Sequence, residues 1–165
     1  MKIHMAKVEK QVSAVIMKIM KSIFAPFKAL FTPSPVKDKT ILVIDDSEVD
    51  RTFALRALAK RYNVIDAVNG QEGIELALKE RPDLIVLDHL MPGMNGTEVC
   101  HLIKQNERLK DIPLIFLTSV DTSQNVLDSL AEGAEAYLVK PVSARDLLEQ
   151  VALRISPLIY SEKSA

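Results

Sequence analysis

The chain has 165 residues, enough for one domain of ordinary size with an appendage but too few for two full domains. Its single cysteine, Cys100, excludes an internal disulfide, and the sequence has no zinc-type Cys/His cluster, so a cytoplasmic location is expected. The net charge of −1 is the sum of +6 on residues 1–39 and −7 on residues 40–165, and the acidic part argues against nucleic acid as a ligand.

Residues 1–31 are predicted to form a basic amphipathic helix, because at about 100° per residue the apolar side chains and the lysines fall on opposite sides. Lys18, Lys21 and Lys28 interrupt the apolar part, so neither a spanning helix nor a signal peptide is expected. Pro26 should kink or end the helix. Such a helix can lie on an anionic membrane surface or bind a partner or its own copy. It can also pack on the domain that follows, and a later Met can be the true start.

Residues 32–39 contain two prolines among polar neighbours and are predicted to be an extended linker. Beyond them, short apolar runs alternate with helical patterns. The expected strands cover about 41–44, 63–67, 84–87, 114–117 and 136–139, and the expected helices about 47–60, 71–79, 96–105, 122–132 and 144–155. This order predicts a doubly wound α/β domain with a parallel sheet over residues 40–157, followed by a tail, 158–165.

Local signals support the first helices of this domain. Ser47 and Asn69 stand at N-cap positions, and the first helix carries Val49, Phe53 and Leu58 at helical spacing among charged residues. The residues left after the last helix are too few for an output domain, so the α/β domain is expected to be the whole globular part.

Four of the expected strands stop at polar residues that chemistry can use: Asp45 and Asp46, Asp88, Thr118, and Lys140. Ligands of open parallel sheets bind at the carboxyl ends of the strands, so these side chains are expected to meet at one edge. At an effective dielectric of about 20, two carboxylates about 4 Å apart repel by on the order of 4 kcal/mol, which Mg²⁺ or Mn²⁺ would relieve. Each residue alone could be an ordinary loop acid or a solvated lysine; together they favour a site for a cation and a phosphoryl group.

The matched strand ends, with the segments LDHLMPGMNG over residues 87–96 and YLVKP over residues 137–141, resemble the receiver domain of two-component response regulators. The resemblance extends over about residues 40–157. It implies a flavodoxin-like, five-stranded sheet of order 2-1-3-4-5, to which the predicted N-terminal helix is added. It also implies a cis peptide bond between Lys140 and Pro141, which an X-Pro bond adopts at a cost of only about 0.5–1 kcal/mol.

The resemblance further implies a role for each site residue. Asp88 would accept a phosphoryl group from a histidine kinase or a phosphotransfer protein. Mg²⁺ would be held by Asp45 or Asp46, by Asp88 and by the backbone carbonyl of Leu90. Lys140 would pair with Asp88 and then with the phosphoryl group. Thr118 would bind a phosphoryl oxygen, and its displacement would let Tyr137 turn inward.

Two features depart from the family pattern. Ser119 follows Thr118 where a smaller Ala is more usual. Leu90 and Val120, two positions beyond Asp88 and Thr118, are both apolar and cannot orient a hydrolytic water. We therefore expect slow self-dephosphorylation.

The expected function is that of a single-domain response regulator, acting on a downstream protein through the face of residues 122–132, 136–139 and 144–155, with a homodimer left open. A second hypothesis is an adaptor, peripheral at a membrane or on a partner through residues 1–31, that uses the unphosphorylated receiver as a docking surface. A third, a Mg²⁺ phosphohydrolase, is disfavoured because Leu90 lacks the carboxylate needed to activate water, so no enzymatic activity is expected.

Overall fold

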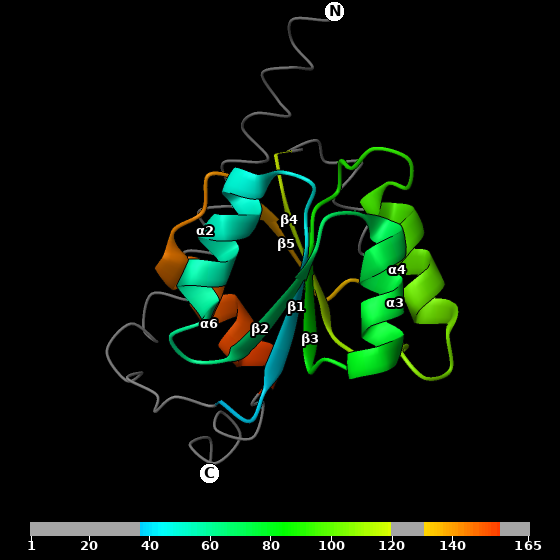
Figure 1. Cartoon of the computed structure of the whole chain (residues 1–165), viewed down its shortest axis with the longest axis horizontal. Helices are drawn as coiled ribbons and strands as arrows, with labels where there is room; N and C mark the ends of the chain where they lie inside the picture. Colours follow the sequence, from blue (N-terminus) through cyan, green and yellow to red (C-terminus); the bar gives the residue numbers. More distant parts are fainter. Residues whose placement is uncertain (1–36, 120–130, 156–165) are drawn as a thin grey trace, which may run out of the picture. The chain divides into compact units, whose positions relative to one another are not determined.

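The computed structural model describes residues 37–119 and 131–155. The elements of this part are β1 (Thr40–Ile44), α2 (Glu48–Leu58), β2 (Asn63–Ala67), α3 (Gly70–Glu80), β3 (Leu84–Leu87), α4 (Gly96–Gln105), β4 (Leu114–Thr118), β5 (Ala136–Val139) and α6 (Ala144–Ile155) (Figure 1). These bounds agree with the predicted elements to within two residues. The predicted N-terminal helix and nearly all of the predicted helix 122–132 lie outside the described residues.

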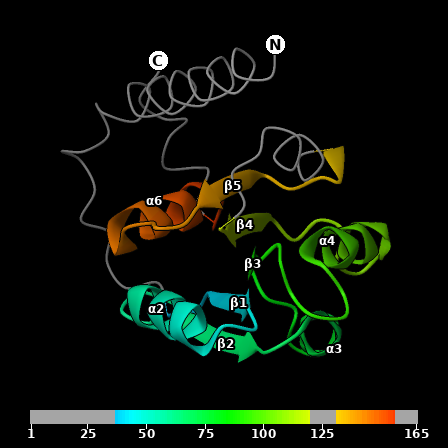
Figure 2. The same ribbon diagram turned by 90° about the horizontal axis from the view of Figure 1, so that it is seen from above.

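The strands form one parallel sheet of order β2-β1-β3-β4-β5, which confirms the predicted doubly wound architecture. Seen from above, α2 and α6 cover one face of the sheet, and α3 and α4 cover the other (Figure 2). A strand covered on both faces has to be apolar at successive positions. β1, β3 and β4 meet this condition, and their apolar residues are all buried. The edge strands β2 and β5 are only partly buried, so burial on both faces is confined to the three central strands.

Successive side chains of β1 serve two separate cores, as the period of two along a strand requires. Ile41 and Val43 belong to the core under α2 and α6, whereas Leu42 and Ile44 belong to the core under α3 and α4. Helices therefore pack on both faces of the sheet. This packing holds the carboxyl ends of the strands, and the residues that follow them, in defined positions.

The apolar face of α2 differs from the predicted one. Leu58 is fully buried as expected, but the side chains of Val49 and Phe53 are 78% and 36% exposed. The buried stripe is instead Ala54, Ala57 and Leu58, at the i, i+3, i+4 spacing of one helix face. Small side chains on this face let α2 pack close to the sheet, and the larger apolar residues are left on its outer side.

Capping residues fix where the helices begin. Ser47 and Asn69 are the N-caps of α2 and α3, as predicted, and they accept hydrogen bonds from the backbone N–H groups of Asp50 and Glu72. At α4, Asn95 and Glu98 form a reciprocal capping box.

The end of the predicted linker is tied to the domain. Lys39 Nζ and the backbone N–H of Thr40 both donate to the Asp83 carboxylate, each at 2.8 Å. The Lys39 carbonyl accepts from the Asn63 N–H at 2.9 Å. Lys39, the last residue before β1, is therefore held against the domain. Within residues 37–119 and 131–155, no helix has the length and apolar character needed to cross a membrane.

Candidate functional site

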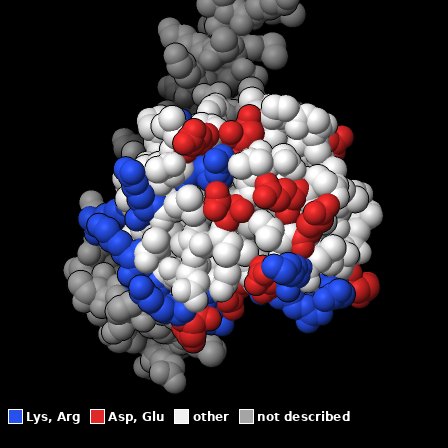
Figure 3. Space-filling model, in the orientation of Figure 1, with Lys and Arg blue, Asp and Glu red and all other residues white. Residues whose placement is uncertain are grey.

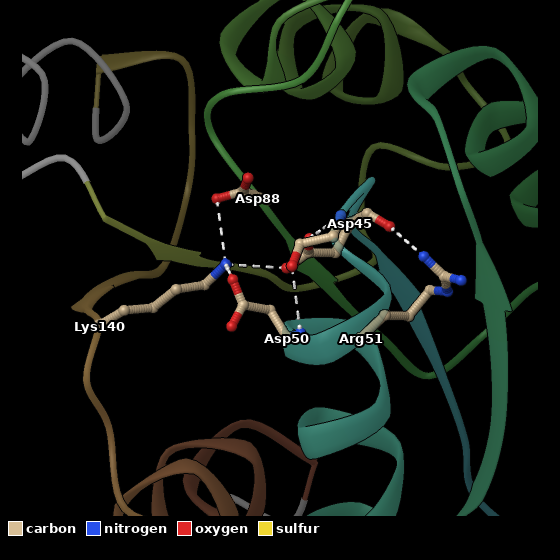
Figure 4. A network of polar contacts seen from close by, with 6 residues as sticks. Asp45, Asp50, Arg51, Asp88 and Lys140 are labelled. Atoms are coloured by element: carbon tan, nitrogen blue, oxygen red, sulfur yellow. Dashed lines mark hydrogen bonds and ion pairs between the residues drawn. The ribbon is translucent and has the colours of Figure 1, made fainter.

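The register of the sheet brings the polar residues at the strand ends together. Ile44 is opposite Leu87, and Leu87 is opposite Phe116, so the residues after β1 and β3 leave the sheet at one level. Thr118 is opposite Val139, which places Lys140 beside the end of β4. Figure 4 shows the result: the Lys140 side chain reaches across to the carboxylates of Asp45 and Asp88. The predicted meeting of these side chains is confirmed.

Three carboxylates, those of Asp45, Asp46 and Asp88, each place an oxygen within 4.8 Å of the others. Asp46 is exposed, but Asp45 and Asp88 are only 3% and 7% exposed. Burial raises the pKa of both buried carboxyls; Lys140 acts against the rise at each, and the charge of Asp45 adds to it at Asp88. The cluster thus concentrates negative charge where water cannot screen it well.

The donor set of this cluster fits a hard divalent cation. Carboxylate oxygens are the ligands that Mg²⁺ and Mn²⁺ prefer. In the described part of the chain, no group donates a hydrogen bond to Asp88 Oδ1, although this atom is buried. A buried acceptor without a donor is costly, and a cation beside it would remove that cost. Asp45, Asp46 and Asp88 are therefore the side chains that could hold the ion.

Lys140 supplies the positive charge of the site. Its Nζ lies 2.9 Å from Asp45 Oδ2, 2.8 Å from Asp50 Oδ2 and 3.6 Å from Asp88 Oδ1 (Figure 4). Burial alone would lower the pKa of Lys140, but its hydrogen bonds to Asp50 and Asp45 and the surrounding carboxylates outweigh burial and raise it. The ammonium thus stays charged, and its two shortest contacts are not to Asp88. The peptide bond from Lys140 to Pro141 is cis, as predicted.

Two residues of the site, Asp50 and Arg51, were missed in the sequence. Arg51 Nη1 donates to the Asp45 carbonyl at 2.9 Å, and its Nε donates to the Asp66 carboxylate at 3.0 Å, which holds the turn after β1 against β2. Asp50 lies in the first turn of α2, where an acidic residue is also favoured by the helix dipole. The one available signal was an acid at the third helical position after the Ser47 cap.

Thr118 and Tyr137, the two predicted switch residues, have different neighbours. Thr118 is fully buried, and its hydroxyl hydrogen-bonds the Asp88 carboxylate, which counters the rise in the pKa of Asp88. The Tyr137 ring is 5.8 Å from the Phe116 ring and 6.4 Å from the His89 ring, measured between centroids. Tyr137 therefore packs in an aromatic group with Phe116 and with His89, the residue that follows Asp88.

The loop from β3 to α4 holds Asp88 and Leu90 in place. The Gly96 N–H donates to the His89 carbonyl at 2.8 Å. A Cβ atom on Gly96 would overlap the Asp88 carbonyl oxygen and lie 2.8 Å from the His89 Cα. The Leu90 side chain is 59% exposed at the rim of the site. That the backbone carbonyl of Leu90 is a ligand of the cation stays a prediction.

The surface near this edge is acidic. On the face shown in Figure 3, Asp and Glu side chains extend from the upper edge, toward the carboxyl ends of the strands, across the middle and right side, and a few lie at the lower edge, while most Lys and Arg side chains lie along the left and lower edges. The carboxylates around Lys140 suit a cation and an anionic group bound together.

The fold and the site define a doubly wound α/β domain with a cluster of charged side chains at the carboxyl edge of its parallel sheet. The model of the response regulator receiver domain matches residues 41–152. The rice two-component response regulator ORR3 is 34% identical over 115 residues, covering 68% of this chain and 88% of its own length. The chain therefore belongs to the response regulator receiver domain family, whose members are phosphorylated signalling domains that typically bind Mg²⁺.

Other relatives are longer proteins. The transcriptional regulatory protein AfsQ1 of Streptomyces coelicolor is 38% identical over 109 residues, which cover 66% of this chain and 47% of AfsQ1. The phosphate regulon regulator PhoB of Pseudomonas aeruginosa is 36% identical over 68% of this chain and 50% of its own length. The chain thus spans about half the length of these relatives.

Solved structures agree. The chemotaxis protein CheY4 of Vibrio cholerae superposes with a TM-score of 0.67 at 30% identity, covering 70% of this chain and 98% of CheY4. The receiver domain of a histidine kinase from Syntrophus aciditrophicus gives 0.67 at 30% identity, covering 77% and 97% of the two chains.

Proposed function

We propose that this receiver is a phosphorylation switch in which Asp88 accepts a phosphoryl group from a histidine kinase or a phosphotransfer protein. The observation that carries the proposal is the state of Asp88. Its Oδ1 is buried, receives no hydrogen bond from the described residues and lies 3.6 Å from the Lys140 ammonium, and its carboxylate is clustered with those of Asp45 and Asp46. A carboxylate oxygen that accepts no hydrogen bond is available to form a new bond to phosphorus.

The transfer forms one bond and breaks one. A carboxylate oxygen of Asp88 attacks the phosphorus of a phosphohistidine; the O–P bond forms as the N–P bond breaks, and the electron pair of the broken bond goes to the imidazole nitrogen, which takes a proton from solvent. Lys140 stabilises the negative phosphoryl oxygens, because its ammonium already lies 3.6 Å from Asp88. Thr118 would move its hydroxyl from the carboxylate to a phosphoryl oxygen.

Asp45, Asp46 and Asp88, with the backbone carbonyl of Leu90, would hold Mg²⁺ or Mn²⁺. When bound, the ion supplies charge neutralisation to the carboxylates and the phosphoryl oxygens. Incubation with acetyl phosphate tests the proposal: with Mg²⁺ the chain should gain the mass of one phosphoryl group, and with a chelator in place of Mg²⁺ it should gain none. Equal phosphorylation under both conditions would contradict the role of the cation.

Leu90 should prolong the phosphorylated state. Its apolar side chain is exposed beside Asp88 and cannot orient an attacking water; Val120, the second apolar position, lies outside the described residues. We expect Leu90→Asn to shorten the half-life of the aspartyl phosphate roughly tenfold, because a polar group can position the water. Leu90→Met is the matched control and should leave the half-life unchanged. A half-life of only seconds in the unaltered chain would contradict the expectation.

Signal output would use protein contacts on the face that includes β5 and α6. Tyr137 would connect that face to the site, since its ring already packs beside His89, the residue after Asp88. A downstream protein or a second copy of the chain would bind there.

Residues 1–31 would place this switch in the cell. On a helix, their lysines and apolar side chains would fall on opposite sides, which suits binding to an anionic membrane surface. The protein would remain cytoplasmic and bind this surface peripherally. The full chain should sediment with anionic liposomes, whereas a chain that begins at Thr40 should stay in the supernatant. Equal sedimentation would exclude the membrane and favour a protein partner for this segment.

A further inference from the structure

The ammonium of Lys140 is shared unequally among three carboxylates. Asp50 Oδ2 and Asp45 Oδ2 are within hydrogen-bond distance, at 2.8 and 2.9 Å, whereas Asp88 Oδ1 is 3.6 Å away. The residue proposed to carry the phosphoryl group is therefore the weakest of the three partners. A phosphoryl group on Asp88 must draw Lys140 away from contacts that already satisfy it.

Asp50 differs from the other two partners because it is not one of the three carboxylates grouped as a candidate cation site. A cation at that site would share the Asp45 carboxylate and weaken its hold on Lys140, but it would leave Asp50 free to keep the lysine. The position of Asp50 is also fixed, since its backbone N–H donates to the Ser47 Oγ at 3.3 Å in the cap of α2.

We propose that Asp50 is a positioning residue that competes with the phosphoryl group on Asp88 for Lys140. This inference rests on the proposed function of Asp88 and adds a residue that opposes the binding of Lys140 to the phosphoryl group. By holding the ammonium toward the first turn of α2, Asp50 weakens the bond between Lys140 and the phosphoryl group. Lys140 then binds the phosphoryl group only when the phosphoryl group and the bound cation together outweigh its attraction to Asp50. The side chain of Asp50 is 40% exposed, so a partner could bind Asp50 and release Lys140.

The test compares affinities for beryllofluoride, a phosphoryl analogue, in the full chain with saturating Mg²⁺. Asp50→Asn should bind it roughly three- to tenfold more tightly than the unaltered chain, the range expected when a competing ion pair of about 1 kcal/mol is removed. Glu48→Gln is the matched control for charge. Glu48 lies in the same first turn, is exposed, and makes no ion pair with Lys140 among the described residues. It should change the affinity by less than about twofold, and Asp50→Glu should restore the original affinity.

A residue with only a structural role would give a different result: Asp50→Asn would lower the free energy of unfolding and leave the affinity unchanged or weaker. That outcome would overturn the inference, as would an equal gain in Glu48→Gln. If the unaltered chain itself binds no beryllofluoride, the proposed function of Asp88 fails and this inference fails with it. Binding with equal affinity in all four proteins overturns the role of Asp50 alone.

Discussion

Asp88→Asn is expected to abolish phosphorylation by acetyl phosphate or by a phosphorylated donor protein. The amide keeps the shape of the side chain but cannot form the acyl phosphate, and loss of a nucleophile that forms a covalent intermediate typically costs on the order of 10⁶-fold in rate. Intact-protein mass spectrometry should show the added phosphoryl group in the unaltered chain and none in the variant. A variant that still gains the full mass would remove Asp88 from the chemistry.

The same variant should be more stable than the unaltered chain when no divalent cation is present, so that loss of phosphorylation cannot be ascribed to unfolding. Burial raises the pKa of the Asp88 carboxyl above its unfolded value of about 3.9, so the native state binds more protons and its stability falls as the pH rises. Neutralising Asp88 also removes a like charge beside Asp45.

We expect the gain to be roughly 1 kcal/mol or more at neutral pH, since one close carboxylate pair costs up to about 4 kcal/mol and Lys140 offsets part of it. The gain should disappear below about pH 3.9, where the carboxyl is protonated in both the folded and the unfolded state. Urea unfolding at several pH values with a chelator present measures this difference. A variant that is less stable at neutral pH would show that Lys140 attraction outweighs burial.

Gly96→Ala should destabilise the domain by about 2–4 kcal/mol, because an added methyl group at a tightly packed position costs 1–3 kcal/mol and here it meets backbone. The new Cβ would overlap the Asp88 carbonyl oxygen and press on His89 and Phe116. Helix propensity has the opposite sign: Ala is favoured over Gly by up to about 1 kcal/mol inside a helix. The sign of the change in the free energy of unfolding therefore shows whether helix propensity or close packing dominates at this position.

Thr97→Ala, one residue further along α4 and partly exposed, is the control and should change stability by less than about 1 kcal/mol. Urea unfolding of the two variants gives the comparison. A Gly96→Ala chain as stable as the unaltered one would mean that the loop can move away from α4, and that Asp88 is less firmly held than the structure shows.

The core of the site could be predicted because a parallel sheet imposes it. Once β1, β3, β4 and β5 are parallel neighbours, the residues that follow them must meet at one edge, whatever their distance along the chain. Asp45, Asp88 and Lys140 are brought together by this rule alone. The family resemblance added the strand order and the cis peptide bond, and both are confirmed.

Contacts that depend on how α2 is rotated against the sheet could not be predicted. The choice between Val49 with Phe53 and the stripe of Ala54 with Ala57 depends on how closely the helix packs, which apolar spacing does not reveal. The same rotation directs Asp50 toward Lys140, so this partner was missed together with the buried face of the helix.

The central claim is that Asp88 alone carries the phosphoryl group, and chemical mapping of the acyl phosphate tests it most directly. The chain is phosphorylated with acetyl phosphate and Mg²⁺, reduced with borohydride, and digested, so that a phosphorylated aspartate is found by mass spectrometry as the corresponding alcohol. The account predicts reduction at position 88 and at no other carboxylate. Reduction at Asp45, Asp46 or Asp50, or no reduction at Asp88, would contradict it.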